Sequence, residues 1–323
     1  MTPDQPVIAI LGPTAVGKTE LSLCLAERLN GEIVSVDSRL IYRGMNIGTA
    51  KPSDAERSGI PHHLIDVAEP DESWSLATFR EAALRAIAAI HGRGRLPFLV
   101  GGTGQYLTAI LEGWSPPVLP ADRALRRELE SFAAEHGVEA LHRRLQQVDP
   151  ETASRIDARN VRRVVRALEI CTLTGLPASR QRAKNPPAFR SLWLGLTLPR
   201  RELYARVDAR IDAMLAAGLV DEVRGLLVGG LSPDLPSMSA IGYRQIAEHL
   251  RGETSLEEAV RRIRRVTRQF VRRQANWFKP DDPRIRWFVR QPGIEDEVER
   301  LVRDWLGAEE TQQKGRVRGP SSG

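Results

Sequence analysis

The stretch VIAILGPTAVGKT, residues 7–19, decides the fold of the first part of the chain. Its first five residues are apolar and mostly β-branched, as in a buried strand, and the remaining eight fit the phosphate-binding pattern G-x-x-x-x-G-K-[ST]. The glycines let backbone N–H groups converge on phosphate oxygens, and the lysine adds a positive charge. Thr19 is the predicted ligand of a Mg²⁺ ion, and the residues predicted to bind a diphosphate or nucleotide are Gly12, Pro13, Thr14, Ala15, Val16, Gly17, Lys18 and Thr19.

The composition is that of an ordinary soluble protein with one large or two modest domains: 323 residues, 41% apolar, 27% charged and a net charge of +6. No apolar run reaches the roughly 20 residues that a membrane helix needs, and residues 1–6 lack the pattern of a secretory signal. Cys24 and Cys171 show no metal-ligand spacing. We expect a cytoplasmic protein with reduced cysteines and no membrane partner. We also expect a monomer, because no heptad or apolar stripe indicates a partner chain.

Arginines crowd two stretches, residues 123–166 and residues 261–279. Charge runs are most often solvated helix faces, and the second stretch also carries an apolar stripe that fits this interpretation. In a chain with a phosphate-binding loop, the two stretches nevertheless favour a polyanionic partner, with nucleic acid as the first candidate.

Residues 1 to about 115 alternate between strands and helices. The expected strands are short apolar runs without clear alternation, as in a parallel sheet buried on both faces, at Val7–Leu11, Glu32–Val36, His63–Val67 and Leu96–Val100. The expected helices are Lys18–Asn30 and Ser75–His91, with Ser75 as N-cap. The pattern predicts an α/β fold with a doubly wound parallel sheet, like that of the P-loop NTPases.

Proline-rich breaks at residues 114–120 and 185–187 enclose a helical, arginine-rich segment. Strand character returns at Ser191–Leu198, and further helices are expected at Arg200–Ala217, Val220–Leu227 and Thr254–Phe278, the last with a capping box at Thr254 and Glu257. We predict a core of residues 1–119 and 189–308, a helical insertion of residues 120–188, and a disordered tail of residues 309–323.

Ligands of open α/β sheets bind at the carboxyl ends of the strands, where two more loops follow. One begins at Asp37. The other, Gly101-Gly102-Thr103-Gly104, carries no carboxylate, so the site is suited to binding and positioning a phosphate, with little provision for activating water. Asp37 can be a general base or a Mg²⁺ ligand, and spacing alone does not decide between them. Asp66 is expected to cap or bridge, and His62 and His63 to make hydrogen bonds within a loop.

Several motifs together resemble one family, the tRNA dimethylallyltransferases, also called tRNA isopentenyltransferases, in their bacterial form. They are GPTAVGKT, DSRLIYRGMNIGTAKP from Asp37, IPHHLIDV from Ile60, LVGGTGQYL from Leu99, RALE from Arg166, AIGYRQ from Ala240 and TRQFVRRQANWF from Thr267. The resemblance covers residues 7 to about 280, and it implies that the helical insertion of residues 120–188 clamps tRNA. Leu40 stands where many relatives carry glutamine, and Asp157 to Asn160 differ from the usual Pro-Asn-Asp, which affects base contacts at those two places.

The resemblance implies transfer of a dimethylallyl group from dimethylallyl diphosphate to the exocyclic amine of the adenosine just 3′ of the anticodon, with Mg²⁺ as cofactor. It implies that Asp37 is the general base, that Thr103 fixes the reacting geometry, and that Arg210 and Arg244 contact the diphosphate, unless these two arginines only form surface ion pairs. The residues that it implies for tRNA binding are Asp37, Ser38, Arg39, Leu40, Thr103, Arg126, Val161, Arg162, Arg163, Val164, Val165, Gly242, Tyr243, Arg244, Gln245, Ile246 and Ala247.

Two other functions stay open at this point. A P-loop small-molecule kinase would use ATP in the same loop and pass a phosphoryl group to a hydroxyl acceptor. An RNA-binding module with a decayed nucleotide site would bind RNA without turnover.

Overall fold

The computed structural model describes residues 4–317 except residues 58, 116–118, 120, 121, 182 and 186, and at residues 115, 183, 184 and 309–317 only the backbone. The chain forms two compact units. Unit 1 comprises Met1–Leu111 and Pro187–Gly323, and unit 2 comprises Glu112–Pro186.

The centre of unit 1 is a six-stranded sheet in which every neighbouring pair is parallel. Its order is β3-β2-β4-β1-β7-β8, with β1 (Pro6–Leu11), β2 (Gly31–Val36), β3 (His62–His63), β4 (Leu96–Gly101), β7 (Arg190–Thr197) and β8 (Ile285–Val289). β1 and β2 are buried along almost their whole length, as expected for strands covered on both faces. The predicted α/β fold class is confirmed.

Two strands differ from the prediction. β3 has only two residues, where the sequence predicted His63–Val67, because Leu64 (φ 63°) and Asp66 (φ 55°) adopt left-handed conformations that end an extended strand. β8 was not predicted at all. It is a short edge strand that pairs with β7, and such tertiary pairing leaves little trace in local sequence.

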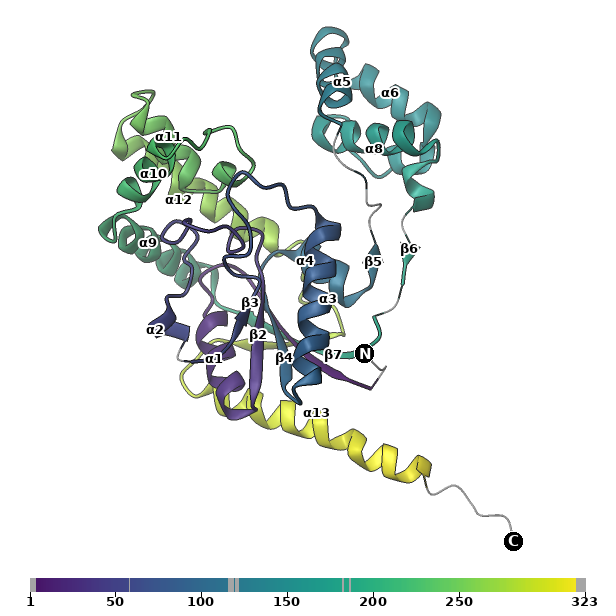
Figure 1. Cartoon of the computed structure of the whole chain (residues 1–323), viewed down its shortest axis with the longest axis vertical. Coiled ribbons are helices and arrows are strands. Elements are labelled where there is room, and N and C mark those ends of the chain that lie inside the picture. Colours follow the sequence, from purple (N-terminus) through teal and green to yellow (C-terminus); the bar gives the residue numbers. More distant parts are fainter. Residues whose placement is uncertain are drawn as a thin grey trace. The chain divides into compact units, whose positions relative to one another are not determined.

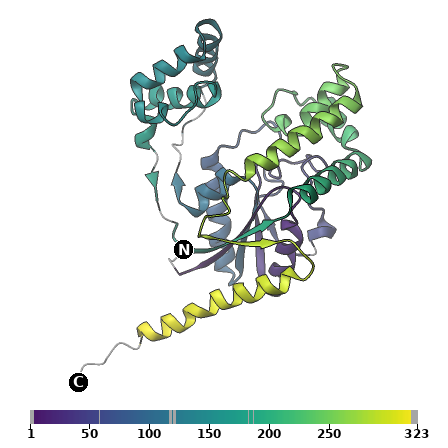
Figure 2. The same ribbon diagram turned by 180° about the vertical axis from the view of Figure 1, so that it is seen from behind.

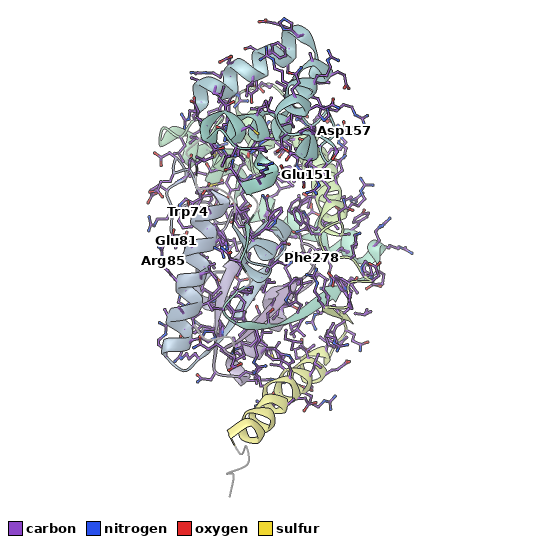
Figure 3. The ribbon with its side chains drawn as sticks, turned by 90° about the vertical axis from the view of Figure 1, so that its right-hand side faces the viewer. Trp74, Glu81, Arg85, Glu151, Asp157 and Phe278 are labelled. Carbon is purple, nitrogen blue, oxygen red and sulfur yellow. The ribbon has the colours of Figure 1, made fainter. Side chains whose placement is uncertain are left out.

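The helices in the first part of unit 1 are α1 (Lys18–Arg28), α2 (Asp54–Arg57), α3 (Leu76–Gly92) and α4 (Gly104–Leu111). α1 and α3 both pack on β2 and β4. Ser75 caps α3 as predicted, accepting a hydrogen bond from the Thr78 N–H at 3.0 Å. On the exposed side of α3, Arg85 donates to Glu81 one turn earlier at 2.6 Å (Figure 3).

A second group of helices in unit 1 consists of α9 (Arg200–Ala216), α10 (Leu219–Val228), α11 (Tyr243–Leu250) and α12 (Leu256–Gln274), with a 3-10 turn, η2, at Ser237–Ser239. These helices pack on one another (Figures 1 and 2). The N-cap of α12 is one residue later than the predicted Thr254, since Ser255 accepts from the Glu258 N–H at 3.2 Å. The helix ends four residues before the predicted Phe278.

The last helix of unit 1, α13 (Ile294–Val317), lies apart from that group and packs against α1 (Figure 1). It crosses into the segment predicted to be a disordered tail from residue 309, whose glutamates, glutamines and lysine are good helix formers. Residues 318–323 of that prediction lie outside the described residues.

Unit 2 is helical, with α5 (Arg123–His136), α6 (Val138–Val148), α7 (Pro150–Ala153), α8 (Val161–Thr174) and a 3-10 turn, η1, at Ala178–Gln181. Two short antiparallel strands, β5 (Trp114–Ser115) and β6 (Ala183–Lys184), pair near its ends. The helices enclose a small apolar core of their own. In the described part of either unit, no helix is long and apolar enough to cross a membrane.

Candidate active site

The P-loop connects β1 to α1 in a conformation that needs its glycines. Gly12 (φ 146°) and Gly17 (φ 102°) both lie in the left-handed half of conformational space. A Cβ on Gly12 would come within 2.5 Å of the carbonyl oxygen of Leu196 on β7. Ala15 also has a positive φ, 67°, which is strained for a residue with a side chain. The loop is therefore closely fitted to the sheet beneath it.

Backbone carbonyl groups of this loop hold the side chain of Lys18. Its ammonium group donates to the carbonyl oxygens of Gly12 at 3.0 Å and Pro13 at 2.8 Å. Burial and, to a smaller extent, the positive charge of Arg210 lower the pKa of Lys18, the carboxylate of Asp37 partly offsets them, and the resulting pKa is about 8. The ammonium thus sits in a site that disfavours its charge unless an anion joins it.

Asp37 follows β2 directly and lies half-buried at the carboxyl end of the sheet. One carboxylate oxygen accepts the N–H of Arg39 at 2.8 Å, which fixes the turn after the strand. The guanidinium of Arg39 contacts the segment around η2: it donates to the carbonyl of Pro236 at 2.6 Å and to the hydroxyl of Ser239 at 3.1 Å. Ser38 and Leu40, on either side, are partly exposed.

Arg210, on α9, joins the same group of charges. The residue is exposed, but partial burial of its guanidinium group lowers its pKa. The carboxylates of Asp37, Glu20 and Glu56 act in the opposite direction and raise the pKa. The charge of Arg210 in turn lowers the pKa of Lys18. The sequence prediction placed Arg210 near the diphosphate, and the structure brings its charge to Lys18 and Asp37.

The loop after β4 is the third part of the site. Gly101 pairs with Leu11 of β1 and with Val36 of β2, so the three loops leave the sheet side by side. Thr103 precedes α4, and its carbonyl accepts the N–H groups of Tyr106 and Leu107. The structure therefore brings together the P-loop, Asp37 and the Thr103 loop, which lie far apart in sequence.

Gln274, at the end of α12, links two of these loops and was missed as a site residue. Its side-chain oxygen accepts the N–H of Thr14 in the P-loop at 2.9 Å, and its side-chain nitrogen donates to the carbonyl of Gly102 at 3.0 Å. The side chain is only 5% exposed. One signal was available: Gln274 follows Val271 by three residues, so it is a polar residue on the apolar face of a helix.

Arg290, just after β8, is a second missed residue. It donates to Glu20 of α1 at 2.9 Å and to Glu295 at 2.8 Å, and a Cβ on Gly17 would come within 3.0 Å of its Nε atom. Since β8 itself was not predicted, no sequence signal placed Arg290 beside the P-loop.

The motif AIGYRQ proves to be largely structural. Tyr243, Gln245, Ile246 and Ala247 are buried, at 0–5% exposure, and Gly242 is buried with them. The Tyr243 hydroxyl donates to Glu222, whose carboxylate accepts the N–H groups of Asn46, Ile47 and Gly48. Burial and this hydrogen bond raise the pKa of Tyr243. α11 turns these five residues toward the core, whereas Arg244 is exposed. The role of the segment in tRNA binding stays a prediction.

The same helical geometry divides the predicted RNA-binding residues of unit 2. Val164 and Val165 are buried in the core of the unit, at 0% and 2% exposure, and their role in tRNA binding stays a prediction. Arg162 and Arg163 are exposed, and Val161 is partly exposed.

Arg126, predicted to bind tRNA, forms an ion pair within unit 2. It forms a bidentate pair with Glu169, at 2.8 and 2.9 Å, and Arg166 contacts the same carboxylate at 2.5 Å. Glu169 is fully buried. Burial opposes its ionisation, but the hydrogen bonds from Arg126 and Arg166 outweigh that effect and lower the pKa of Glu169.

The other polar candidates make the structural contacts that were expected of them. Asp66 accepts from Lys51 at 2.5 Å, His62 bonds to the carbonyl of Ile60 at 2.8 Å, and His63 pairs with Glu32 at 2.7 Å. Within the described residues no group of three or more His, Cys, Asp or Glu side chains could enclose a metal ion. A Mg²⁺ ion would have to be held by one or two protein oxygens together with a substrate, and the exposed Thr19 and the half-buried Asp37 fit that type of site.

Known proteins match this chain over nearly its whole length. A sequence model of the family described as IPP transferase matches residues 40–281. The chain belongs to the IPP transferase family. A tRNA dimethylallyltransferase of Roseiflexus sp. (strain RS-1) is 51% identical over 94% of this chain and 99% of its own. One of Thermomicrobium roseum is 50% identical over 94% of each chain.

Two solved structures agree with this assignment. The tRNA isopentenylpyrophosphate transferase of Bacillus halodurans is 41% identical, with a TM-score of 0.72 over 96% of this chain and 100% of its own. A eukaryotic dimethylallyltransferase described as acting on tRNA is 28% identical, with a TM-score of 0.79 over 94% of this chain and 80% of its own. The predicted family and the prediction of a transferase enzyme are confirmed, and membership of the IPP transferases disfavours a P-loop kinase.

Proposed function

We propose that the chain transfers a dimethylallyl group from dimethylallyl diphosphate to N6 of the adenosine 3′-adjacent to the anticodon of tRNA and releases pyrophosphate. The observation that carries this proposal is the set of three loops at the carboxyl ends of β1, β2 and β4: a phosphate-binding loop, one carboxylate, and a glycine loop without an acid to activate water. The names of the relatives at about half identity support it.

The P-loop holds the leaving group. As the bond between the allylic carbon and the diphosphate oxygen breaks, negative charge grows on that oxygen, and backbone N–H groups with the Lys18 ammonium stabilise it. The lowered pKa of Lys18 means that binding a diphosphate draws a proton to this lysine above about pH 8. Arg210 adds a second positive charge nearby, and Arg244 is the weaker candidate because it is exposed on α11.

Asp37 is the general base. The amine nitrogen of adenine attacks the allylic carbon, forms the new C–N bond and must lose one proton, which the Asp37 carboxylate accepts. Thr103 is on the loop next to that of Asp37 and orients the reacting base. A Mg²⁺ ion, when bound through Thr19, would neutralise charge on the diphosphate.

The RNA is held by Arg162 and Arg163, two exposed arginines of unit 2 that act on the phosphate backbone. The target base has to leave the anticodon loop to reach Asp37, and loop bases are already partly unstacked, which keeps that cost to about a few kcal/mol. We propose that a single chain carries the whole reaction, which light scattering of the protein with and without tRNA would test.

Incubation of hypomodified tRNA with dimethylallyl diphosphate and Mg²⁺, followed by digestion and mass spectrometry, tests the reaction. We expect an adenosine that has gained C5H8, and its position is read from fragments of the anticodon arm. An unchanged tRNA, together with phosphoryl transfer from ATP to a small molecule, would contradict the proposal and restore the kinase.

A further inference from the structure

We infer that Gln274 is a positioning residue that sets the distance between the diphosphate-binding loop and the loop that carries Thr103. This inference rests on the proposed function only in that the two loops bind the two substrates. Gln274 comes from α12, more than 170 positions away in sequence from both loops, and its carboxamide bonds to both: Thr14 N–H at 2.9 Å and Gly102 C=O at 3.0 Å.

The carboxamide is the side-chain group that suits this position. The Thr14 N–H can only donate and the Gly102 carbonyl can only accept, so one orientation of the amide satisfies both. Because Gln274 is only 5% exposed, water has little access to replace either hydrogen bond. A Glu side chain of the same length would lose the donor when ionised and face the Gly102 carbonyl with a negative oxygen.

The packing around Gln274 leaves the two loops little freedom. A Cβ on Gly102 would lie 2.4 Å from the Gln274 nitrogen, so the loop approaches α12 more closely than a residue with a side chain allows. Trp277 packs so closely on Gly104 that a Cβ there would lie 2.2 Å from its ring. The end of α12 therefore fixes the Thr103 loop on both sides of Thr103 and ties it to the P-loop through one side chain.

A consequence follows for the P-loop itself. The Thr14 N–H, one of the amides that the motif could offer to a phosphate, is already bonded to Gln274. Gln274 thus leaves the other backbone amides of the P-loop for the diphosphate. It acts through Thr14 and Gly102, and its loss should disturb the alignment of the two substrates more than the binding of either.

Steady-state kinetics of Gln274→Ala and Gln274→Glu test this inference. Misplacing a reacting group by about 1 Å costs up to about 100-fold in rate, so we expect kcat of Gln274→Ala to fall by about 10- to 100-fold. KM for dimethylallyl diphosphate and the Kd for tRNA should change little by comparison. Thr267→Val, on the same helix, removes only an intrahelical bond to the Ile263 carbonyl (2.8 Å) and is the matched control.

The pH dependence of Gln274→Glu gives a signature that lost stability alone would not produce. A protonated carboxyl group can donate to Gly102 and accept from Thr14, and burial raises the pKa of a carboxyl group at such a site. The ratio of its kcat to that of the parent should therefore rise as pH falls from about 8 to about 6. Parent-like kcat in Gln274→Ala, or a ratio that is flat with pH, would overturn the inference. A parent protein that transfers no dimethylallyl group would instead refute the proposed function.

Discussion

Replacing Lys18 with methionine should stabilise the ligand-free protein at neutral pH while removing its ability to bind a diphosphate. The pKa of Lys18 is lowered from 10.5 to about 8. At about pH 7 the lysine is protonated both in the folded and in the unfolded chain, so folding carries an unfavourable term of about 3 kcal/mol. Methionine has no charge and a similar length, but it loses the two hydrogen bonds to Gly12 and Pro13, worth about 1 kcal/mol each. The net gain at about pH 7 is therefore about 1 kcal/mol.

The sign of this effect should reverse at high pH. Between about pH 8 and pH 10.5 the folded parent binds fewer protons than its unfolded chain, so its stability rises with pH relative to that of the variant. At about pH 10 the variant should then be the less stable protein, by about 1 kcal/mol.

Guanidinium unfolding of unit 1 at about pH 7 and about pH 10 measures the difference in stability between the parent and Lys18→Met. Lys51→Met is the control: Lys51 is also buried, but it is paired with Asp66, so its loss should destabilise at both pH values. If Lys18→Met is less stable than the parent at neutral pH, or if the difference between them does not change with pH, the argument from desolvation is refuted. Calorimetry with pyrophosphate should show binding to the parent and none to Lys18→Met.

Three further predictions concern the base, the RNA clamp and the core of unit 2. Asp37→Ala should abolish turnover with modest loss of tRNA affinity, and a large loss of affinity with chemistry intact would contradict its role as base. Charge reversal at Arg162 and Arg163 should weaken tRNA binding and flatten its salt dependence, as a filter-binding titration would show; an unchanged slope would exclude them from the backbone contact. Glu169→Gln should destabilise unit 2 by about 3 kcal/mol, because two guanidinium groups lose their shared buried carboxylate. Since the pKa of Glu169 is lowered in the folded state, its stabilisation is complete above about pH 4.5 and is lost as pH falls through the folded pKa, which acid unfolding of the parent and variant would reveal.

The parts of the fold that the sequence predicted well are those fixed by local chemistry. The strand before Gly12 and the helix after it follow from an apolar run and a glycine loop, and the start of α3 follows from Ser75. Where tertiary contacts decide, prediction failed. β8 forms because it can pair with the edge strand β7. β3 ends after His63 because Leu64 and Asp66 adopt left-handed conformations, and in this turn Asp66 contacts Lys51.

The site shows the same division. Asp37 and Thr103 could be placed at one edge of the sheet from the sequence, because neighbouring parallel strands bring the loops at their carboxyl ends together. The predicted RNA-binding ranges around Val164 and Ile246 contain both exposed and buried side chains, because a continuous range on a helix always includes residues from the buried face. Gln274 and Arg290 escaped because they reach the P-loop from elements whose docking no local pattern specifies.

The lack of a water-activating acid beside the P-loop is a consequence of packing. In nucleotide-hydrolysing enzymes an acidic residue commonly ends a strand near the one that carries the P-loop. Here β4 lies between β1 and β2 and ends in two glycines. A Cβ on Gly101 would lie 2.1 Å from the carbonyl oxygen of Val36, and one on Gly102 would lie 2.4 Å from the side chain of Gln274. An aspartate at either position would displace β2 or break the link between the loops. The nearest strand-end carboxylate is then Asp37, one strand further from β1, which is a better position for receiving a proton from an incoming amine than for directing water at a phosphate.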